Sequence, residues 1–270
     1  MPTLQKAALD LLEVLTDFVA GTATGGSATT LQDTGAAALE PSGWFLGGPI
    51  FFKTGGKIGR SAAITVDADG PPRTLTFVDP GGTAVVAGDK YVAAGNRFPR
   101  GVLIESINKS LRDLGALVQL SDGVVVIVAD QYDYDLSALG TPVSNVLQVH
   151  EATLQASPWD YETHHHWREE GVYLRFDHGW LPDVGTKLRI YWQGDFTDVE
   201  TDTASLPVYV RPVWLRWAAA VYACLWSFEQ KGRDDPKLID LYNLAKGEQR
   251  RYTPLFPAAQ VQWSPRFGQL

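Results

Sequence analysis

The consecutive residues His164, His165 and His166 are the most visible candidate for metal binding. On a strand the first and third of them would share a face, which is how a metal site can begin. No Cys pair and no His-Glu-x-x-His motif accompanies them, and the nearest carboxylates are Glu169 and Glu170. Because the number of ligands decides whether a metal is held, a solvated loop is favoured over a metal site.

Two short segments carry aspartates at a spacing that could bind calcium. The segment Asp130–Asp135 supplies three carboxylates and the segment Asp67–Gly70 supplies two. Calcium needs six or more oxygen ligands, and neither segment has the closing Glu of an EF-hand loop; Val78 stands at the closing position of the second. The ordinary role of Asp in turns favours two polar turns.

Residues for phosphate binding or covalent catalysis are incomplete. The run Gly21–Ser27 lacks the Lys of a phosphate-binding loop and follows a helical pattern where a strand is required. No Gly-x-Ser-x-Gly elbow occurs, and Cys224, the only cysteine, has no sign of an activating partner and cannot form a disulfide within one chain. A carboxylate pair for glycoside hydrolysis stays open, because Asp and Glu are plentiful. We expect no enzyme, no metal and no cofactor.

A crowd of aromatic residues in one β-like segment leaves two interpretations open. Flat aromatic faces could stack on sugar rings, as in a carbohydrate-binding module. Aromatics are also favoured in strands, and filling a sandwich core and its rim is the favoured interpretation. The residues are Trp159, Tyr161, Trp167, Tyr173, Trp180, Tyr191 and Trp192.

Composition and charge exclude several classes of protein. The 270 residues are 45% hydrophobic and carry a formal net charge of -8. This charge argues against broad electrostatic binding to nucleic acid or to an anionic membrane. The apolar run 213–226 contains Arg216 and is shorter than the roughly 20 residues of a membrane span. The acidic residues Asp10, Glu13 and Asp17 exclude a signal peptide at the start, so we expect a protein of a reducing compartment with no membrane partner.

Helices are predicted near both ends and once between. An apolar stripe every three or four residues predicts a helix over residues 1–20. A second stripe behind Pro99 predicts a helix at about 100–114. Pro212 begins an almost entirely apolar helix that ends near Gly232, and Asp234-Asp235-Pro236 begins another. The first and last of these helices need a cover for their apolar faces, which favours packing them together.

The segments between the helices predict strands. Residues 21–36 are rich in Gly and Thr and are typical of a long loop or an edge segment. From 43 to 92, and again from 146 to 210, short β-like runs alternate with turn signals. The continuous run Val124–Val128 predicts a strand buried on both faces.

These patterns predict an α+β fold: a helical base, in which the N-terminal helix packs with a C-terminal helix pair, carrying a large antiparallel β-rich elaboration and an extended C-terminal arm. The segment Thr253–Leu270 has three prolines and four large apolar side chains, and little of its own to fold around. The expected divisions are 1–20 and 211–252 for the helical base, 21–140 for a β-rich domain with one inserted helix, 141–210 for a β-sandwich-like segment, and 253–270 for the arm.

Three stretches together resemble structural proteins of tailed bacteriophage particles, most nearly the head–tail adaptor (neck, connector) proteins under the portal. The first is Thr22–Thr34 followed by Gly43-Trp44-Phe45. The second is Gly171–Phe176 with Gly185–Gly194, and the third is Leu206–Pro212 leading into the Trp-rich helix. The likeness covers most of the chain, and its motifs are turn and packing patterns.

The resemblance implies a virion protein that is assembled in the host cytoplasm and forms a homo-oligomeric ring, commonly of twelve subunits. Such a ring joins the portal protein to the next neck or tail component, and DNA passes through its channel without sequence-specific binding. The β portion, about 170 residues, is large for such an adaptor, which leaves open a carbohydrate-binding tail or capsid decoration protein. We expect the base and the arm to supply the interface residues: Trp214, Trp217, Tyr222, Trp226, Tyr252, Phe256, Trp263 and Phe267.

Overall fold

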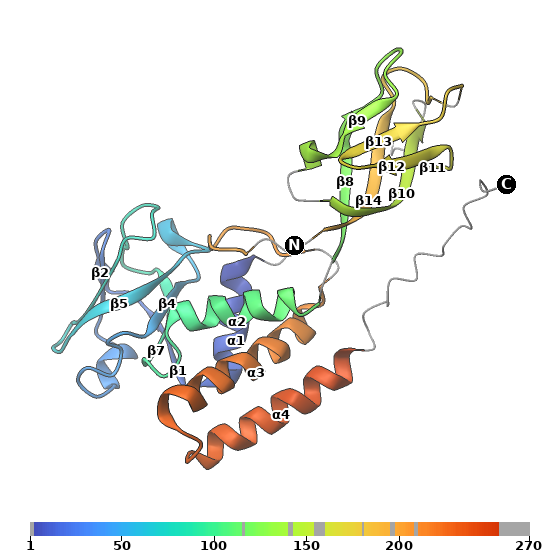
Figure 1. Ribbon diagram of the computed structural model, residues 1–270. Helices are drawn as coiled ribbons and strands as arrows, with labels where there is room; N and C mark the ends of the chain where they lie inside the picture. Colours follow the sequence, from blue (N-terminus) through green and yellow to red (C-terminus); the bar gives the residue numbers. More distant parts are fainter. Residues whose placement is uncertain are drawn as a thin grey trace. The chain divides into compact units, whose positions relative to one another are not determined.

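A computed structural model (Figure 1) describes residues 3–114, 117–139, 143–153, 160–179, 181–194, 198–207 and 210–253. The described residues form two compact units. The first unit takes in the residues up to Leu111 and those from Asp198 onward, and the second takes in those between Arg112 and Thr197. The second unit is therefore an insertion into the sequence of the first.

The first unit combines an antiparallel sheet with four helices. Its strands are β1 (Phe18–Thr22), β2 (Gly25–Gly26), β3 (Thr30–Asp33), β4 (Pro49–Phe52), β5 (Ser61–Ala68), β6 (Arg73–Phe77) and β7 (Lys90–Ala94). Its helices are α1 (Leu4–Leu15), α2 (Arg100–Arg112), α3 (Pro212–Lys231) and α4 (Pro236–Tyr252), with short 3-10 turns at Ala37–Leu39 and Gly55–Lys57.

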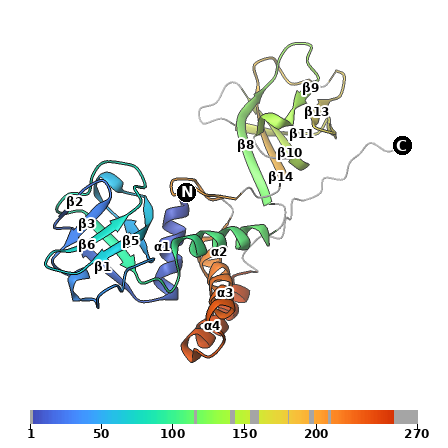
Figure 2. The ribbon, with the colours of Figure 1, turned by 60° about the vertical axis from the view of Figure 1, so that its left-hand side comes forward.

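The seven strands curl into a barrel-like sheet in the order β1-β7-β4-β5-β6-β3-β2 (Figure 2). The first and last strands of this order are consecutive parts of one run of chain. Within that run the Ala23 N–H donates to the Asp89 carbonyl at 2.8 Å and the Thr24 N–H donates to the Gln32 carbonyl at 2.7 Å. One apolar cluster with members from nearly every strand, among them Phe52, fills the interior, so this sheet has a core of its own.

The segment 21–36, interpreted from sequence as a long loop or edge segment, contains the end of β1 and the strands β2 and β3. Thr is β-branched and suits a strand, which explains part of the difference. Gly21 has a separate reason: a Cβ there would lie 2.5 Å from the hydroxyl oxygen of Tyr91. The glycine allows the buried tyrosine ring to lie against the backbone of β1.

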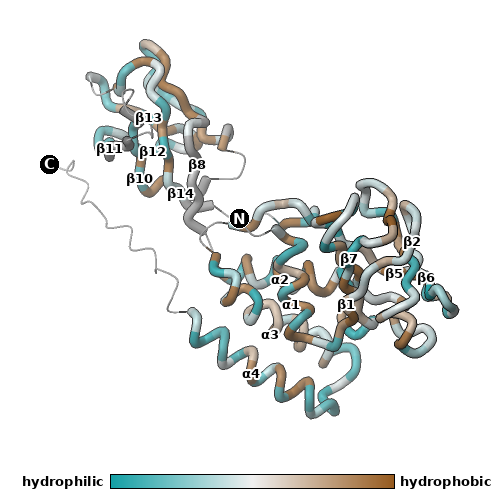
Figure 3. Tube along the Cα trace, turned by 180° about the vertical axis from the view of Figure 1, so that it is seen from behind, coloured by the Kyte–Doolittle hydropathy of each residue, from teal (hydrophilic) through white to brown (hydrophobic). Residues whose placement is uncertain are grey.

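The four helices form the helical layer of the first unit. The Thr3 hydroxyl caps α1 by accepting from the Lys6 N–H, and the Asp235 side chain caps α4. Both α1 and α4 pack on α3, as predicted for the helical base. Figure 3 shows hydrophilic and hydrophobic residues alternating along α4, as expected of a helix with one covered face.

The second unit is a β-sandwich of two antiparallel sheets. The four-stranded sheet has the order β11-β10-β14-β8 and the three-stranded sheet the order β12-β13-β9. Between them lies one apolar cluster that includes Trp192, Phe176 and Leu174. The strands are β8 (Leu117–Val126), β9 (Asp133–Asp135), β10 (Val143–Thr153), β11 (Asp160–His164), β12 (Trp167–Glu170), β13 (Tyr173–Phe176) and β14 (Lys187–Gly194), with a 3-10 turn at Leu136–Leu139.

Two sequence expectations about this unit differ from the structure. The run around β8 is buried on one face only, because Val125 and Ile127 are buried while Val126 and Val128 are 40% and 50% exposed. An antiparallel sheet packed on a core with one face only buries every second side chain of a strand, so buried and exposed side chains alternate along this run. The division expected at residue 140 also differs, because β8 pairs with β14 and residues 117–139 therefore belong with the sandwich.

The fold class predicted from the sequence is confirmed for the described residues: a helical base with an N-terminal helix and a C-terminal pair, and a large antiparallel β elaboration. The predicted arm lies, after Thr253, outside the described residues.

Candidate assembly surface

Helix α3 is the longest helix of the helical layer, and α1 and α4 both pack on it. Pro212 occupies its first turn, and Gly232, at φ +81°, ends it by donating its N–H to the Phe228 carbonyl at 2.9 Å. The small residues Ala219 and Ala223 and the thiol of Cys224 are completely buried. Burial raises the pKa of Cys224 to about 12, so this thiol stays protonated and packs as a small apolar group.

The aromatic residues predicted to pack the base differ in burial. Trp214 is 4% exposed, and its indole N–H donates to the Thr253 hydroxyl at 3.3 Å. Trp217, Tyr222 and Trp226 are each only partly buried. Trp214 therefore belongs to the fold of a single copy, whereas the other three retain accessible aromatic surface.

These partly buried rings lie on two flanks of α3. At 3.6 residues per turn, Tyr222 and Trp226 are about 40° apart, while Trp217 is about 140° from Tyr222. The packing of α1 and α4 thus leaves aromatic surface on both sides of the helix. Amphipathic aromatic rings of this kind are enriched in protein interfaces.

The remaining predicted interface residues are only partly described. Tyr252, in the last turn of α4, is half-buried, and the Arg251 guanidinium lies 5.6 Å from its ring centre. Phe256, Trp263 and Phe267, predicted as anchors of the arm, lie outside the described residues.

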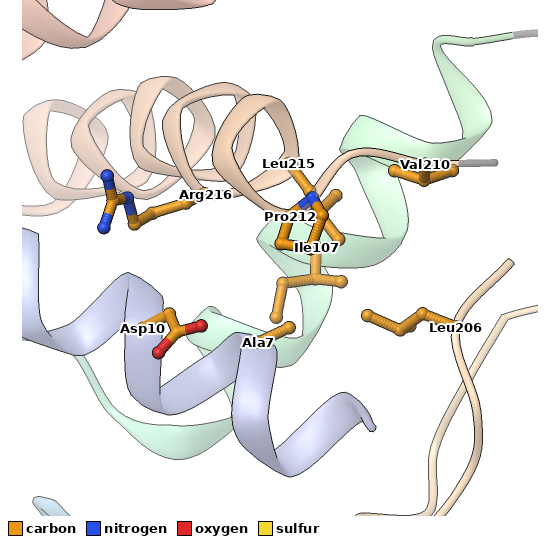
Figure 4. Close-up of a pocket in the computed structure, with 8 residues that line it drawn as sticks. All are labelled: Ala7, Asp10, Ile107, Leu206, Val210, Pro212, Leu215 and Arg216. Atoms are coloured by element: carbon orange, nitrogen blue, oxygen red, sulfur yellow. The ribbon is translucent and has the colours of Figure 1, made fainter. Parts of the chain in front are cut away.

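A small cleft opens where α1, α2 and α3 meet the segment 206–210 (Figure 4). Apolar side chains line it, and Asp10 of α1 and Arg216 of α3 lie on one side of it. The enclosed space is about 10 Å³, which is room for about one water molecule. The Arg216 Nε is buried without a hydrogen-bond partner among the described residues, and the guanidinium lies 5.2 Å from the Trp217 ring centre. The cleft is too small for a ligand, and it is a place where helices pack against one another.

The segment that leads back into α3 is fastened at Asp202. Its carboxylate accepts from the Ser61 N–H at 2.6 Å, the Ser61 hydroxyl at 2.7 Å and Arg100 Nη2 at 2.9 Å. Arg100 Nε donates in turn to the Ser61 hydroxyl at 2.7 Å. Asn108 exchanges two 3.1 Å hydrogen bonds with the backbone of Val199.

We call residues 198–207 the strap, because they tie α2 and β5 to the entry of α3. An open groove of about 540 Å³ lies beside the strap and contains both acidic and basic side chains. Ser61 is buried and all of its hydrogen bonds go to the strap and to Arg100, so its arrangement is that of a structural junction. Sequence reasoning missed this junction, since Ser61, Arg100 and Asp202 are far apart in the chain and carry no spacing signal.

The Asp67–Gly70 segment is divided between a strand and a turn: Asp67 and Ala68 belong to β5, whereas Asp69 and Gly70 are exposed at the bend before β6, as the polar-turn interpretation expects. Asp67 lies in β5 with a fully buried carboxylate, which accepts from Arg73 Nε at 2.7 Å and Nη2 at 2.6 Å. Arg73 is 2% exposed and also donates to the carbonyls of Glu40 and Pro41. Its hydrogen bond to Asp67 raises the pKa of Arg73 further. The pair fastens the segment before β4 to the barrel-like sheet.

The Asp130–Asp135 segment is divided between a turn and a strand. Asp130 has a positive φ of 60°, while Asp133 and Asp135 lie on β9. Hydrogen bonds from Arg175 lower the pKa of Asp133, and the hydrogen bond from Ser137 lowers that of Asp135. The carboxylates of Asp133 and Asp135 are thus each bound to a group of the protein. Only Asp130 lies in a turn, as the polar-turn interpretation expects.

The histidine run does not lie in one solvated loop. His164 ends β11 with a side chain only 11% exposed; its Nδ1 lies 3.7 Å from Glu151 Oε2 and its ring 5.0 Å from Phe176. His165 is exposed. In the part of the chain that the structure describes, no three His, Cys, Asp or Glu side chains gather in a way that could hold a metal ion.

The aromatic residues of the second unit mostly point inward. Tyr134, Phe176 and Trp192 belong to the sandwich core, and Trp167 packs against it, whereas Tyr173 is 45% exposed. The side chains of Trp159, Tyr161 and Trp180 lie outside the described residues. For the described ones, the structure favours core filling over a platform for sugars.

Comparison with known proteins adds no identity: no protein-family model matches the sequence, and no curated protein matches it significantly. Within the described residues, no helix has both the length and the apolar character needed to span a membrane.

Proposed function

We propose that this protein is a structural adaptor of a tailed-phage particle, forming a ring that connects the portal to the neck or tail and surrounds the DNA channel. In this proposal the helical layer seats the ring, the segment after Thr253 reaches a partner, and the partners are further copies of the chain, the portal and the next tail component. The dodecamer, the virion location and assembly in the host cytoplasm belong to the same proposal.

The observation that carries the proposal is the incomplete cover of α3. This helix is apolar around most of its circumference, yet Trp217 on one flank and Tyr222 and Trp226 on the other remain partly exposed after α1 and α4 have packed. Leaving such rings in water forfeits free energy of about 25 cal/mol per Å². A second copy packed against these flanks would recover it, and aromatic anchors carry most of the energy of an interface.

The first test is the mass of the purified protein by light scattering, alone and mixed with the candidate portal protein. We expect a stoichiometric ring to form, at the latest when the portal is present. A stable small oligomer that ignores the portal contradicts the proposal. A second sample lacking residues 254–270 tests the arm: it should fold as the full chain does and fail to join the portal.

A further inference from the structure

The net charge of the chain is distributed unevenly along the sequence. The span 112–197, which forms the second unit, carries five Lys and Arg against 13 Asp and Glu. The span 211–253, which contains α3 and α4, carries eight against five, and the rest of the chain carries ten against 13. The inserted unit is thus acidic by the same amount as the whole chain, while the last two helices are basic.

The positive charge gathers on the outward face of α4. Ala245 is completely buried on the side that packs on α3. Arg250 and Arg251 follow it by five and six residues and lie about 140° and 120° round the helix. Both are exposed, as is Lys246. Arg251 lies 3.5 Å from Glu248, and the exposed Asp240 lies on the same side of the helix as Arg251. With Lys237, α4 carries four cations against two carboxylates, so it keeps an excess of positive charge.

Further exposed cations stand where α3 passes into α4. Lys231, Arg233 and Lys237 are all exposed, and the Arg233 guanidinium lies 5.6 Å from the ring centre of Phe228. Glu229, Asp234 and Asp235 stand among them, so this turn carries balanced charge and the excess belongs to α4 itself. Favourable interaction with helix dipoles explains cations in a last turn, but Lys237 stands in the first turn of α4, where a cation is disfavoured. The basic face needs a reason other than helix stability.

The acidic unit offers a matching surface at one end of its sandwich. Ile127 exchanges hydrogen bonds of 2.8 and 2.9 Å with the backbone of Gly185 and Thr186, which brings the loop after β8 together with the loop before β14. Asp130 and Asp183 are exposed on these two loops. Val128 and Val184, on the same loops, are 50% and 61% exposed. Exposed apolar side chains next to carboxylates are the composition of an interface with a polar rim.

We propose that the basic outward face of α4 in one copy binds the acidic, valine-bearing end of the second unit in the next copy. The inference rests on the proposed ring and names a second pair of surfaces, besides the aromatic flanks of α3, that would join its subunits. Two different surfaces of one chain make a head-to-tail contact, and such contacts generate a ring where the rotation between neighbouring copies closes. Opposite charges guide the encounter and fix its register, while like charges exclude the reversed arrangement. The valines supply the apolar part of the contact.

A charge-swap experiment tests this assignment under the condition in which the wild-type ring forms. The first variant is Arg250→Glu with Arg251→Glu, and the second is Asp130→Lys with Asp183→Lys. Each should raise the protein concentration needed for half assembly by on the order of tenfold. Mixing the two variants should restore assembly, because each α4 then faces a unit of opposite charge. All four substitutions in one chain should restore it as well.

The matched control is Lys53→Glu with Lys90→Glu, which makes the same charge change on exposed residues of the barrel-like sheet and should assemble as the wild type does. Circular dichroism should be unchanged in every variant, and so should the thermal midpoint of the α4 and control variants, since these side chains are exposed. Asp130 has a φ of 60°, which suits Asp better than Lys, so the midpoint of the Asp130→Lys variant should fall slightly and its assembly is measured well below that midpoint.

Three outcomes overturn part of the argument. Rings that form equally well from both charge-reversed variants would overturn the inference and leave the adaptor proposal standing. A wild-type protein that forms no ring, with or without the portal, would overturn the adaptor proposal itself. Unchanged rings together with salt-sensitive binding of duplex DNA that Arg250→Glu/Arg251→Glu abolishes would assign α4 to the phosphate backbone in place of a second copy.

Discussion

The barrel-like sheet and the helical layer, both in the first unit, differ in how completely they satisfy their own groups. The sheet encloses its apolar cluster and pairs its buried ions: Arg73 is 2% exposed and lies within hydrogen-bond distance of the buried Asp67. The helical layer leaves Trp217 and Trp226 partly exposed on α3. The sheet also exposes aliphatic side chains, among them Val66 and Val78 at 50% and 66%, but large aromatic rings are the side chains enriched in protein interfaces. Contacts with other subunits are therefore expected on the helical layer.

The largest expected effect is the loss of the buried ion pair. Arg73→Ala would leave the Asp67 carboxylate buried without its cation, together with the Glu40 and Pro41 carbonyls that Arg73 binds. Removing one partner of a buried pair costs about 3–5 kcal/mol. We expect this loss in the free energy of unfolding measured by urea denaturation. Lys90→Ala, at an exposed position of the same sheet, should stay within about 0.5 kcal/mol; equal effects would show that the pair is not a central support.

A smaller loss is expected at the strap. Asp202→Ala removes the acceptor of the Ser61 N–H and hydroxyl and of Arg100. Hydrogen bonds to a charged group contribute about 1.5–3 kcal/mol, and the Ser61 N–H would lose its partner. We expect about 2–3 kcal/mol less stability, again by urea denaturation. The neighbouring exposed Glu200 provides the matched control, because Glu200→Ala leaves the junction intact; a loss as large there would mean that the strap is sensitive everywhere.

The helical layer should respond in assembly more than in stability. Trp226→Ala removes a ring that is only partly buried, so the expected loss is about 1–2 kcal/mol. Ring formation, followed by light scattering, should fail under the conditions that assemble the wild type. Leu39→Ala, which truncates an 85% exposed apolar residue of the first unit, is the control and should assemble. If Trp226→Ala assembles as well as the wild type, the helical layer is not the assembly surface that the comparison with the sheet predicts.

Local patterns predicted the existence of the four helices, but the first ends at Leu15 and not near residue 20, because Phe18 begins β1. They predicted the pairing of the strands poorly. Pro212, Gly232 and Pro236 mark the limits of α3 and α4 in the sequence because capping and φ restrictions act within a few residues. The pairing of β8 with β14 joins residues 61 to 77 positions apart, from Val126–Lys187 to Leu117–Gly194, and the Ser61–Asp202 junction joins residues 141 apart. A periodic pattern within a short window cannot predict contacts between residues so far apart in the chain.

The candidate surface shows the same limit. Sequence identified the aromatic residues of α3 but could not separate Trp214, which is buried, from Trp226, which is not. That separation depends on which side of α3 each neighbouring helix covers, and the covering is decided by packing between distant segments. The charge difference between residues 112–197 and 211–253, by contrast, can be counted in the sequence. It becomes visible once the chain is divided at the limits of the two units.

The smallest expected effect concerns acid in the second unit. Hydrogen bonds from Arg175 hold the pKa of Asp133 below its ordinary value. A carboxyl whose folded-state pKa is lowered stabilises the fold above its unfolded pKa of about 3.9, and the contribution disappears as the pH falls through the folded-state value. Wild type should therefore exceed Asp133→Asn in stability near neutral pH and lose this advantage below about pH 4. Because the pair is largely exposed, about 0.5 M salt should shrink the difference. Urea midpoints at the two pH values measure it, and an advantage that grows in acid would contradict the assignment of Arg175 as the partner that lowers the pKa.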